Sequence, residues 1–145
     1  MARRKVKYNQ GYFQPKNPTK YRGKHIPIYR SGWELAFMRL CDGHPNVECW
    51  ASESHAIPYR NPFTGKMAKY IPDFLLSYAD KIGKKHIELV EVKPSKQAGL
   101  TESKNKSDKA AVILNKAKWT AAQEWCKRRG IKFRIVTENE IYHKP

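Results

Sequence analysis

Acidic residues are scarce in this sequence. The 145 residues include 13 Asp or Glu against 29 Lys or Arg, which gives a formal net charge of +16 at pH 7. Residues 1–30 contain no acid at all. Such an excess of positive charge is unusual for a protein that acts on small molecules, and it predicts a polyanionic partner, with nucleic acid as the first candidate. The length suits one domain with a genuine core.

The sequence also lacks paired cysteines and long apolar runs. Cys41, Cys49 and Cys126 form no CxxC pair and are odd in number, which argues against a disulfide framework and against a zinc ribbon. The sequence shows no apolar run long enough to cross a bilayer, no signal-peptide pattern and no basic amphipathic helix. We therefore expect a soluble protein that is not exported and has no membrane partner.

Residues 1–30 combine nine cations with five aromatic residues and three prolines. Because proline fixes φ and removes an N–H donor, we expect an extended arm without regular structure, followed by a folded domain over residues 31–145. Cations interleaved with aromatic rings suit phosphate contact and base stacking, so we expect the arm to bind DNA. Docking on a partner protein and a flexible solubilising tail are the alternatives. The cations expected to contact nucleic acid are Arg3, Arg4, Lys5, Lys7, Lys16, Lys20, Arg22, Lys24 and Arg30 in the arm, and Lys96, Lys116 and Lys118 further along the chain.

A helix is predicted to begin at Ser31. Ser31 and Glu34 have the spacing of a capping box, apolar residues follow at helical spacing, and residues 42–45 end the pattern. Glu34 lies at the edge of the apolar stripe, where its carboxylate can serve as the cap's partner or take part in catalysis. The spacing gives both roles equal weight.

The middle of the chain is rich in short extended segments. Strands are expected over residues 47–50, 55–59, 67–71, 74–78 and 86–93. A turn over residues 61–65 predicts a hairpin, and we expect three or four consecutive antiparallel strands to form the core of a sheet.

A long helix is predicted from about residue 108 to about residue 129, with Gly130 as its stop. It joins the strand that ends at Lys93 to a final strand over residues 131–137. This arrangement is a βαβ crossover, so the two strands should be parallel neighbours.

The chemistry of the sequence is concentrated around Pro72–Asp73 and Glu91–Val92–Lys93. Strand alternation places Glu91 and Lys93 on one face of an otherwise apolar strand, where burying them would be costly unless they served a metal or each other. Asp73 precedes the neighbouring strand, and Glu34 can join from the helix. Carboxylate oxygens of this kind are the ligands that Mg²⁺ prefers.

We therefore expect Asp73, Glu91 and the Val92 carbonyl to bind a metal ion, with Glu34 holding a metal-bound water or a second ion. Lys93 would position or help to deprotonate the attacking water and would offset charge in the transition state. The metal would be Mg²⁺, with Mn²⁺ able to substitute. A surface salt bridge is the ordinary interpretation of such a motif, but the apolar strand and the basic chain favour a nuclease.

Two further residues have alternative interpretations. Glu53 is either a solvated acid at a strand end or a fourth acid near the metal. Arg30 either clamps a phosphate or is a plain surface residue, and the two are equally weighted.

The order of these elements resembles the PD-(D/E)XK nucleases, which include restriction enzymes, junction resolvases and TnsA-type transposon endonucleases. Nearly the whole chain also resembles the head completion nucleases of large contractile-tailed phages. The motifs that carry this second resemblance are residues 15–23, residues 29–35 with Glu34, Ile57–Pro58–Tyr59, residues 70–74 with Asp73, residues 91–94 with Glu91 and Lys93, and residues 115–119.

The resemblance implies an α/β fold with a restriction-endonuclease-like core. Its mixed sheet of four to five strands would be flanked by the N-terminal catalytic helix and the long crossover helix, with the basic arm extending from it. It also implies a DNA endonuclease that acts on double-stranded phage DNA in the host cytoplasm or the virion, with portal or neck proteins and a second copy as further partners. The alternatives are a non-catalytic DNA-binding or virion-structural protein, and a junction resolvase or transposon-end nuclease.

Overall fold

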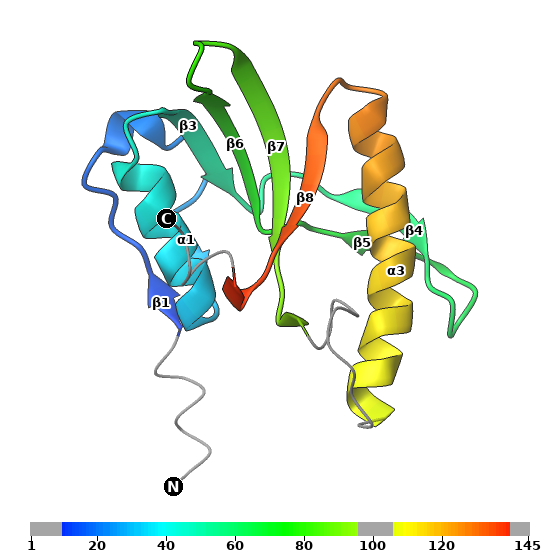
Figure 1. Cartoon of the computed structure of the whole chain (residues 1–145). Coiled ribbons are helices and arrows are strands. Elements are labelled where there is room, and N and C mark those ends of the chain that lie inside the picture. The colour runs from blue at the N-terminus through cyan, green and yellow to red at the C-terminus, as the bar shows by residue number, and fades with distance from the viewer. Residues whose placement is uncertain (1–9, 96–105, 140–145) are drawn as a thin grey trace, which may run out of the picture.

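The computed structural model describes residues 10–95 and 106–139 (Figure 1). Five of the predicted DNA-binding cations, Arg3, Arg4, Lys5, Lys7 and Lys96, lie outside these residues. The elements are β1 (Gly11–Tyr12), the 3₁₀ helix η3 (Pro18–Lys20), β2 (Ile28–Tyr29), α1 (Gly32–Gly43), β3 (Val47–Ser52), β4 (Ile57–Arg60), β5 (Met67–Tyr70), β6 (Phe74–Ala79), β7 (Lys85–Val92), α3 (Lys106–Lys127) and β8 (Lys132–Val136).

A four-stranded sheet with the order β3-β6-β7-β8 forms the centre of the fold. The β3/β6 and β6/β7 pairs are antiparallel, and β7 pairs with β8 in parallel, with Glu91 opposite Ile135. The predicted crossover through α3 is therefore confirmed. The expectation that consecutive strands share one sheet was wrong, because β4 and β5 pair only with each other. The inward side chains of that hairpin pack against α3, together with Leu89 of the central sheet.

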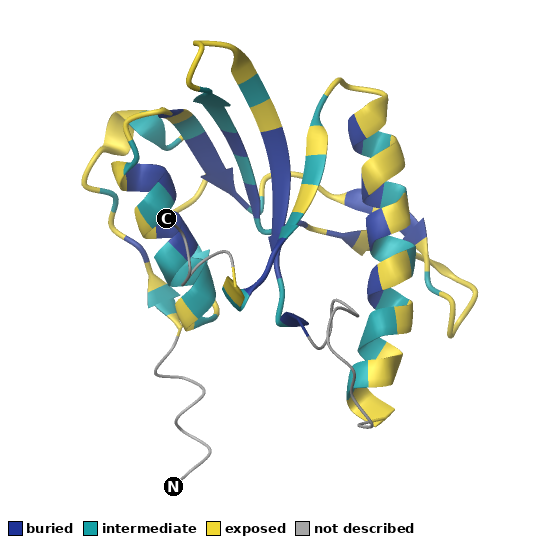
Figure 2. Cartoon of the chain, in the orientation of Figure 1, coloured by how far each residue is buried: buried dark blue, intermediate teal, exposed yellow. Residues whose placement is uncertain are grey.

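The two helices lie on opposite sides of the sheet (Figure 1). On one side, Phe37 and Met38 of α1 pack with Phe74 and Val90. On the other side, Trp119 of α3 belongs to the second apolar cluster with Leu89. Burial is concentrated between these layers (Figure 2). This arrangement confirms the α/β fold class, and burial of these large side chains is its main source of stability.

The predicted helix boundaries agree closely with the structure. Ser31 caps α1 in an extended conformation, and its Oγ accepts a hydrogen bond of 3.1 Å from the Glu34 N–H. Gly130, just after α3, has a φ of +69°, which is the left-handed conformation that glycine adopts without strain.

The described part of the basic N-terminal segment packs on the domain. β1 pairs with β2, and the Phe13 N–H donates to the Pro27 carbonyl. The ring centres of Phe13 and Trp50 lie 5.9 Å apart. The Tyr21 ring lies 4.7 Å from Trp50. The expectation that prolines keep this segment free of regular structure was therefore wrong for residues 10–30. Burial of aromatic rings on Trp50 outweighs the cost of ordering the segment.

Asp42, near the end of α1, holds the same segment in place. Asp42 is 4% exposed, and its carboxylate accepts hydrogen bonds from the N–H groups of Lys16 (2.9 Å) and Asn17 (3.1 Å). Lys20 donates through Nζ to the carbonyls of Asp42 and His44. From the sequence we expect Lys20 to contact DNA. In the structure its ammonium group instead binds carbonyl groups at the C-terminal end of α1.

We expect Asp42→Ala to lower the free energy of unfolding by about 1–3 kcal/mol, because two backbone donors in a partly buried contact lose their acceptor. Urea unfolding followed by tryptophan fluorescence measures this change. Glu48→Ala is the control, because the Glu48 side chain is 43% exposed and its ion pair with Lys85 spans 3.7 Å. A loss no larger than that of the control would show that Asp42 does not anchor the segment.

Candidate active site

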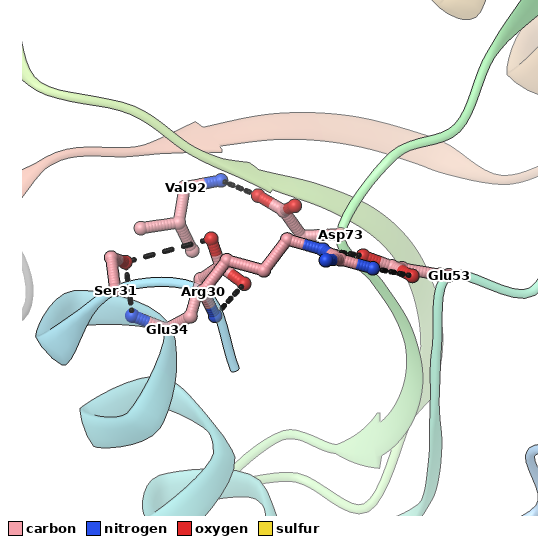
Figure 3. Close-up of polar contacts among 6 residues, drawn as sticks. All are labelled: Arg30, Ser31, Glu34, Glu53, Asp73 and Val92. Carbon is pink, nitrogen blue, oxygen red and sulfur yellow. Dashed lines mark hydrogen bonds and ion pairs between the residues drawn. The ribbon is translucent and has the colours of Figure 1, made fainter. Parts of the chain in front are cut away.

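Asp73 and the end of β7 lie side by side. Asp73 stands one residue before β6, whose first residue, Phe74, pairs with Val90. The Val92 N–H donates a hydrogen bond of 2.8 Å to Asp73 Oδ2 (Figure 3). The sheet register therefore brings the two halves of the predicted motif together, with the Asp73 carboxylate beside the Glu91–Val92–Lys93 segment.

Glu91 is buried between two donors. Its side chain is only 7% exposed, and Oε1 accepts a hydrogen bond of 2.8 Å from the Tyr70 hydroxyl. Lys93 Nζ lies 3.5 Å from Glu91 Oε2. The predicted neighbours Glu91 and Lys93 are thus in contact, and Tyr70 fixes the carboxylate from the opposite side.

Glu34 makes the contacts of a helix cap and faces the other acids. Its Oε1 accepts from the Arg30 N–H at 3.2 Å, and its Oε2 accepts from the Ser31 hydroxyl at 3.5 Å. Figure 3 shows Glu34 together with Arg30 and Asp73 at the N-terminus of α1. The capping interpretation describes its hydrogen bonds, and its position keeps the catalytic interpretation open.

Burial dominates the electrostatics of these acids, and repulsion adds to it at Asp73 and Glu34. Burial raises the pKa of Asp73 well above its usual value, and the negative charges of Glu91 and Glu34 raise it further. Burial also raises the pKa of Glu34, with contributions from Glu53 and Glu91. The pKa of Glu91 is raised by burial as well, although Lys93 and Tyr70 oppose the shift. A cation among the three carboxylates would relieve both the burial cost and the repulsion.

Glu53 is paired with Arg30. Arg30 Nε lies 3.0 Å from Glu53 Oε2, and Arg30 Nη2 donates to Oε1 at 3.3 Å. Among the described residues, Glu53 alone of the non-glycine residues has a positive φ, +48°, and its N–H donates to the Asp73 carbonyl at 2.9 Å. The pairing with Arg30 does not describe a solvated strand end, and a role for Glu53 as a fourth acid near the metal stays a prediction. A side chain held in a rare backbone conformation beside Asp73 is typical of a functional site.

Sequence reasoning missed Tyr70 and placed Lys118 only on a DNA-facing helix. Lys118 Nζ lies 5.7 Å from the centre of the Tyr70 ring and 5.9 Å from that of Tyr59. Burial lowers the pKa of Lys118, and the charge of Lys93 lowers it further. The signal for Tyr70 was present in the sequence: strand alternation over residues 67–71 places it on the buried face, three residues before Asp73.

The other described cations among the predicted DNA contacts are more peripheral. Lys16, Arg22, Lys24 and Lys116 are exposed. The Arg22 guanidinium donates through Nε to the Thr19 carbonyl. Nothing in these contacts prevents the four side chains from reaching a phosphate.

The oxygen donors fit a magnesium-type ion better than a cage for a softer metal. Within residues 10–95 and 106–139, no three Asp, Glu, His or Cys side chains are arranged to hold a metal ion as they stand. Mg²⁺ does not need such a cage, because it keeps several waters and binds through one or two carboxylates and substrate phosphates. Asp73 and Glu91 supply such carboxylates next to a backbone carbonyl.

Comparison with known proteins gives two matches. Residues 44–138 match the family model described as TnsA-like endonuclease N terminal. The head completion nuclease of Enterobacteria phage T4 is 37% identical over 142 residues, which cover 90% of this chain and 92% of the phage protein. In the part of the chain that the structure describes, no helix is both long and apolar enough to cross a membrane.

We expect Asp73→Asn to change how the stability of the metal-free protein depends on pH. Because the folded-state pKa of Asp73 is raised, its contribution is fully present below the unfolded pKa of about 4 and is lost as pH rises through the folded pKa. The melting temperature of Asp73→Asn should therefore rise relative to that of the native protein as the pH increases above about 4. Thermal unfolding in chelator measures the difference.

Asp80→Asn is the matched control for this measurement. The hydrogen bond with His86 lowers the pKa of Asp80, so its contribution has the opposite sign: it is present above the unfolded pKa and is lost as pH falls. Melting differences that change in parallel with pH for the two variants would contradict the raised pKa of Asp73.

Proposed function

This chain belongs to the TnsA-like endonuclease family, and from that premise we propose that it hydrolyses phosphodiester bonds of DNA with the help of Mg²⁺ bound at Asp73 and Glu91. The observation that carries the proposal is the 2.8 Å hydrogen bond from the Val92 N–H to Asp73, which joins the two halves of the motif. The raised pKa values of the three clustered acids support a cation at this point.

The ligands of the ion would be the carboxylates of Asp73 and Glu91 and the carbonyl of Val92. In an extended strand, the N–H and C=O of one residue point to the same side. The Val92 N–H points to Asp73, whereas the next N–H, that of Lys93, points away to the Val136 carbonyl. The Val92 carbonyl is therefore directed towards Asp73. When bound, the ion would supply Lewis-acid polarisation of the phosphate and a more acidic water.

The remaining residues would orient the reactants. Lys93, 3.5 Å from Glu91, would hold the attacking water and offset negative charge on the phosphate. Tyr70 would keep the Glu91 carboxylate in one orientation. Glu34 would accept a proton or a hydrogen bond from water near Asp73. Arg30 would exchange Glu53 for a phosphate, since its side chain is 55% exposed and lies beside Glu34 and Asp73 in Figure 3.

DNA is the substrate that the charge and the family favour. A net charge of +16 provides a long-range attraction for a polyanion. Because the similar phage T4 protein is a head completion nuclease, we further propose that this chain acts on phage DNA during head completion in the host cell. Contact with portal or neck proteins, cleavage as a homodimer and DNA binding by residues 1–30 are finer proposals that follow from the same resemblance.

The cleavage assay tests the proposed function. The native protein should cut linear and supercoiled duplex in Mg²⁺ or Mn²⁺. Cleavage should stop when a chelator is added. Asp73→Ala and Lys93→Ala should each lower the rate by about 10²- to 10⁴-fold, because each removes a group that acts on the reacting phosphate or water. Lys84→Ala, in the distant turn between β6 and β7, should cleave normally. Equal cleavage by all of these proteins would contradict the proposed site.

Tyr70→Phe tests how Glu91 is held. We expect about a 10- to 100-fold loss in metal affinity or cleavage rate, because groups that orient a metal-binding carboxylate have effects of this size. Titration of the cleavage rate with Mg²⁺ measures the loss. Tyr59→Phe is the matched control, since Tyr59 is also a buried tyrosine beside Lys118. Equal effects of the two substitutions would assign Tyr70 to packing alone.

A further inference from the structure

The β4–β5 hairpin is a basic ribbon without acids. Residues 54–72 contain no Asp or Glu, whereas three cations, Arg60, Lys66 and Lys69, lie on the hairpin or its turn. All three are exposed. None of them belongs to the cations expected to contact nucleic acid from the sequence. This stretch therefore presents positive charge that no acid of its own neutralises.

The hairpin has two chemically different faces. Ile57, Tyr59 and Tyr70 are buried in the cluster formed with α3. The opposite face carries exposed Pro58, Arg60, Met67 and Lys69, with Pro58 paired to Lys69 and Arg60 paired to Met67. Each of these two cross-strand residue pairs thus places a cation beside an apolar side chain. This outward face has the composition that suits a phosphate backbone and the groove next to it.

The turn of the hairpin is held in one shape. Asn61 Oδ1 accepts from the Phe63 N–H at 2.8 Å and from the Thr64 N–H at 3.3 Å, and the Arg60 guanidinium donates to the Gly65 carbonyl at 2.7 Å. Phe63 is 59% exposed at this turn. A turn that is already ordered loses little conformational entropy when it binds a partner.

The same hairpin leads directly into the active site. β5 ends at Tyr70, which contacts Glu91, and Asp73 follows three residues later. Figure 1 shows the hairpin passing α3, with its turn projecting beyond the helix. From Asp73 to Met67 the extended chain covers up to about 20 Å at 3.3 Å per residue. That distance corresponds to about six base pairs of duplex.

We propose that the outward face of the β4–β5 hairpin binds duplex DNA to one side of the scissile phosphate. The proposal rests on the proposed function and extends it by naming a second DNA contact. Lys66 and Lys69 contact backbone phosphates about six base pairs or fewer from the cut. The absence of acids over residues 54–72 and the continuity with Asp73 favour DNA over a protein as the occupant.

The test compares two double variants with the same net charge. Lys66→Gln/Lys69→Gln changes the hairpin, and Lys81→Gln/Lys84→Gln changes exposed lysines of the turn between β6 and β7. Binding to a labelled duplex of about 30 base pairs is measured by anisotropy without divalent ions, between about 0.05 and 0.2 M salt. The hairpin variant should lower the slope of log affinity against log salt by about 1.8, and the control should leave it nearly unchanged.

Ethylation interference on the same duplex gives a positional readout. Phosphates up to about six base pairs to one side of the cut should matter for the native protein and for the control variant. In the hairpin variant only the phosphates at the cut itself should still matter. If the double variant does not fold, the single variant Lys66→Gln in the exposed turn replaces it in the test. This variant should lower the slope of log affinity against log salt by about 0.9.

The outcomes separate the hairpin from the proposed function. Equal salt slopes for the two double variants, in a protein that still cuts DNA in Mg²⁺, would overturn the hairpin contact and leave the endonuclease intact. Such a result would assign the face to another occupant, such as a protein. If the native protein neither bound nor cut duplex, the proposed function would be wrong, and the hairpin contact that rests on it would be wrong as well.

Discussion

The burial of three carboxylates close together is the constraint on which this site depends. Asp73, Glu91 and Glu34 come from a loop, a strand and a helix. Burial makes each of them costly to ionise, and the charge of Glu91 adds to that cost for the other two. Folding alone would favour separating them. The surrounding structure instead fixes each one by a separate hydrogen bond, from Val92, Tyr70 and Arg30 respectively. The protein therefore loses some stability by keeping three acids together in an otherwise basic molecule.

The rest of the fold supplies the rigidity that this arrangement needs. The central strands hold Asp73 and Glu91 in register, and α1 and α3 cover the two faces of the sheet. Tyr70 reaches Glu91 from a hairpin that belongs to a separate small sheet. The central sheet and the small hairpin sheet thus meet at one carboxylate. Its position depends on packing against α3 as much as on the strand that carries it.

Local signals account for the parts that the sequence predicted well. The Ser31 cap, the Gly130 stop and the parallel crossover follow from residue types and spacing that act within one or two elements. The packing of residues 10–30 on Trp50 could not be read in this way, because it depends on contacts distant in sequence. The separate pairing of β4 with β5 has the same cause, since α3 determines which face is buried.

The candidate site also has parts that local sequence patterns predict and parts that only the folded chain brings together. The motif around Asp73, Glu91 and Lys93 is short enough to identify by alternation and order. The pairing of Arg30 with Glu53 is not, because these residues lie 23 positions apart and meet only in the folded chain. Glu34 lies outside the residues 44–138 that match the family model, whereas the other three lie within them. The capping box was therefore the more direct sequence signal for its position.

The two ends of α1 are complemented by charges of opposite sign. Glu34 lies in its first turn beside the acidic site, and Lys20 donates to carbonyls at its last turn. The aligned peptide dipoles of a helix amount to about half a positive charge at the N-terminus. This partial charge belongs to the backbone, so it does not titrate. Whatever the protonation of the three acids, α1 keeps a fixed positive potential at the point where they meet.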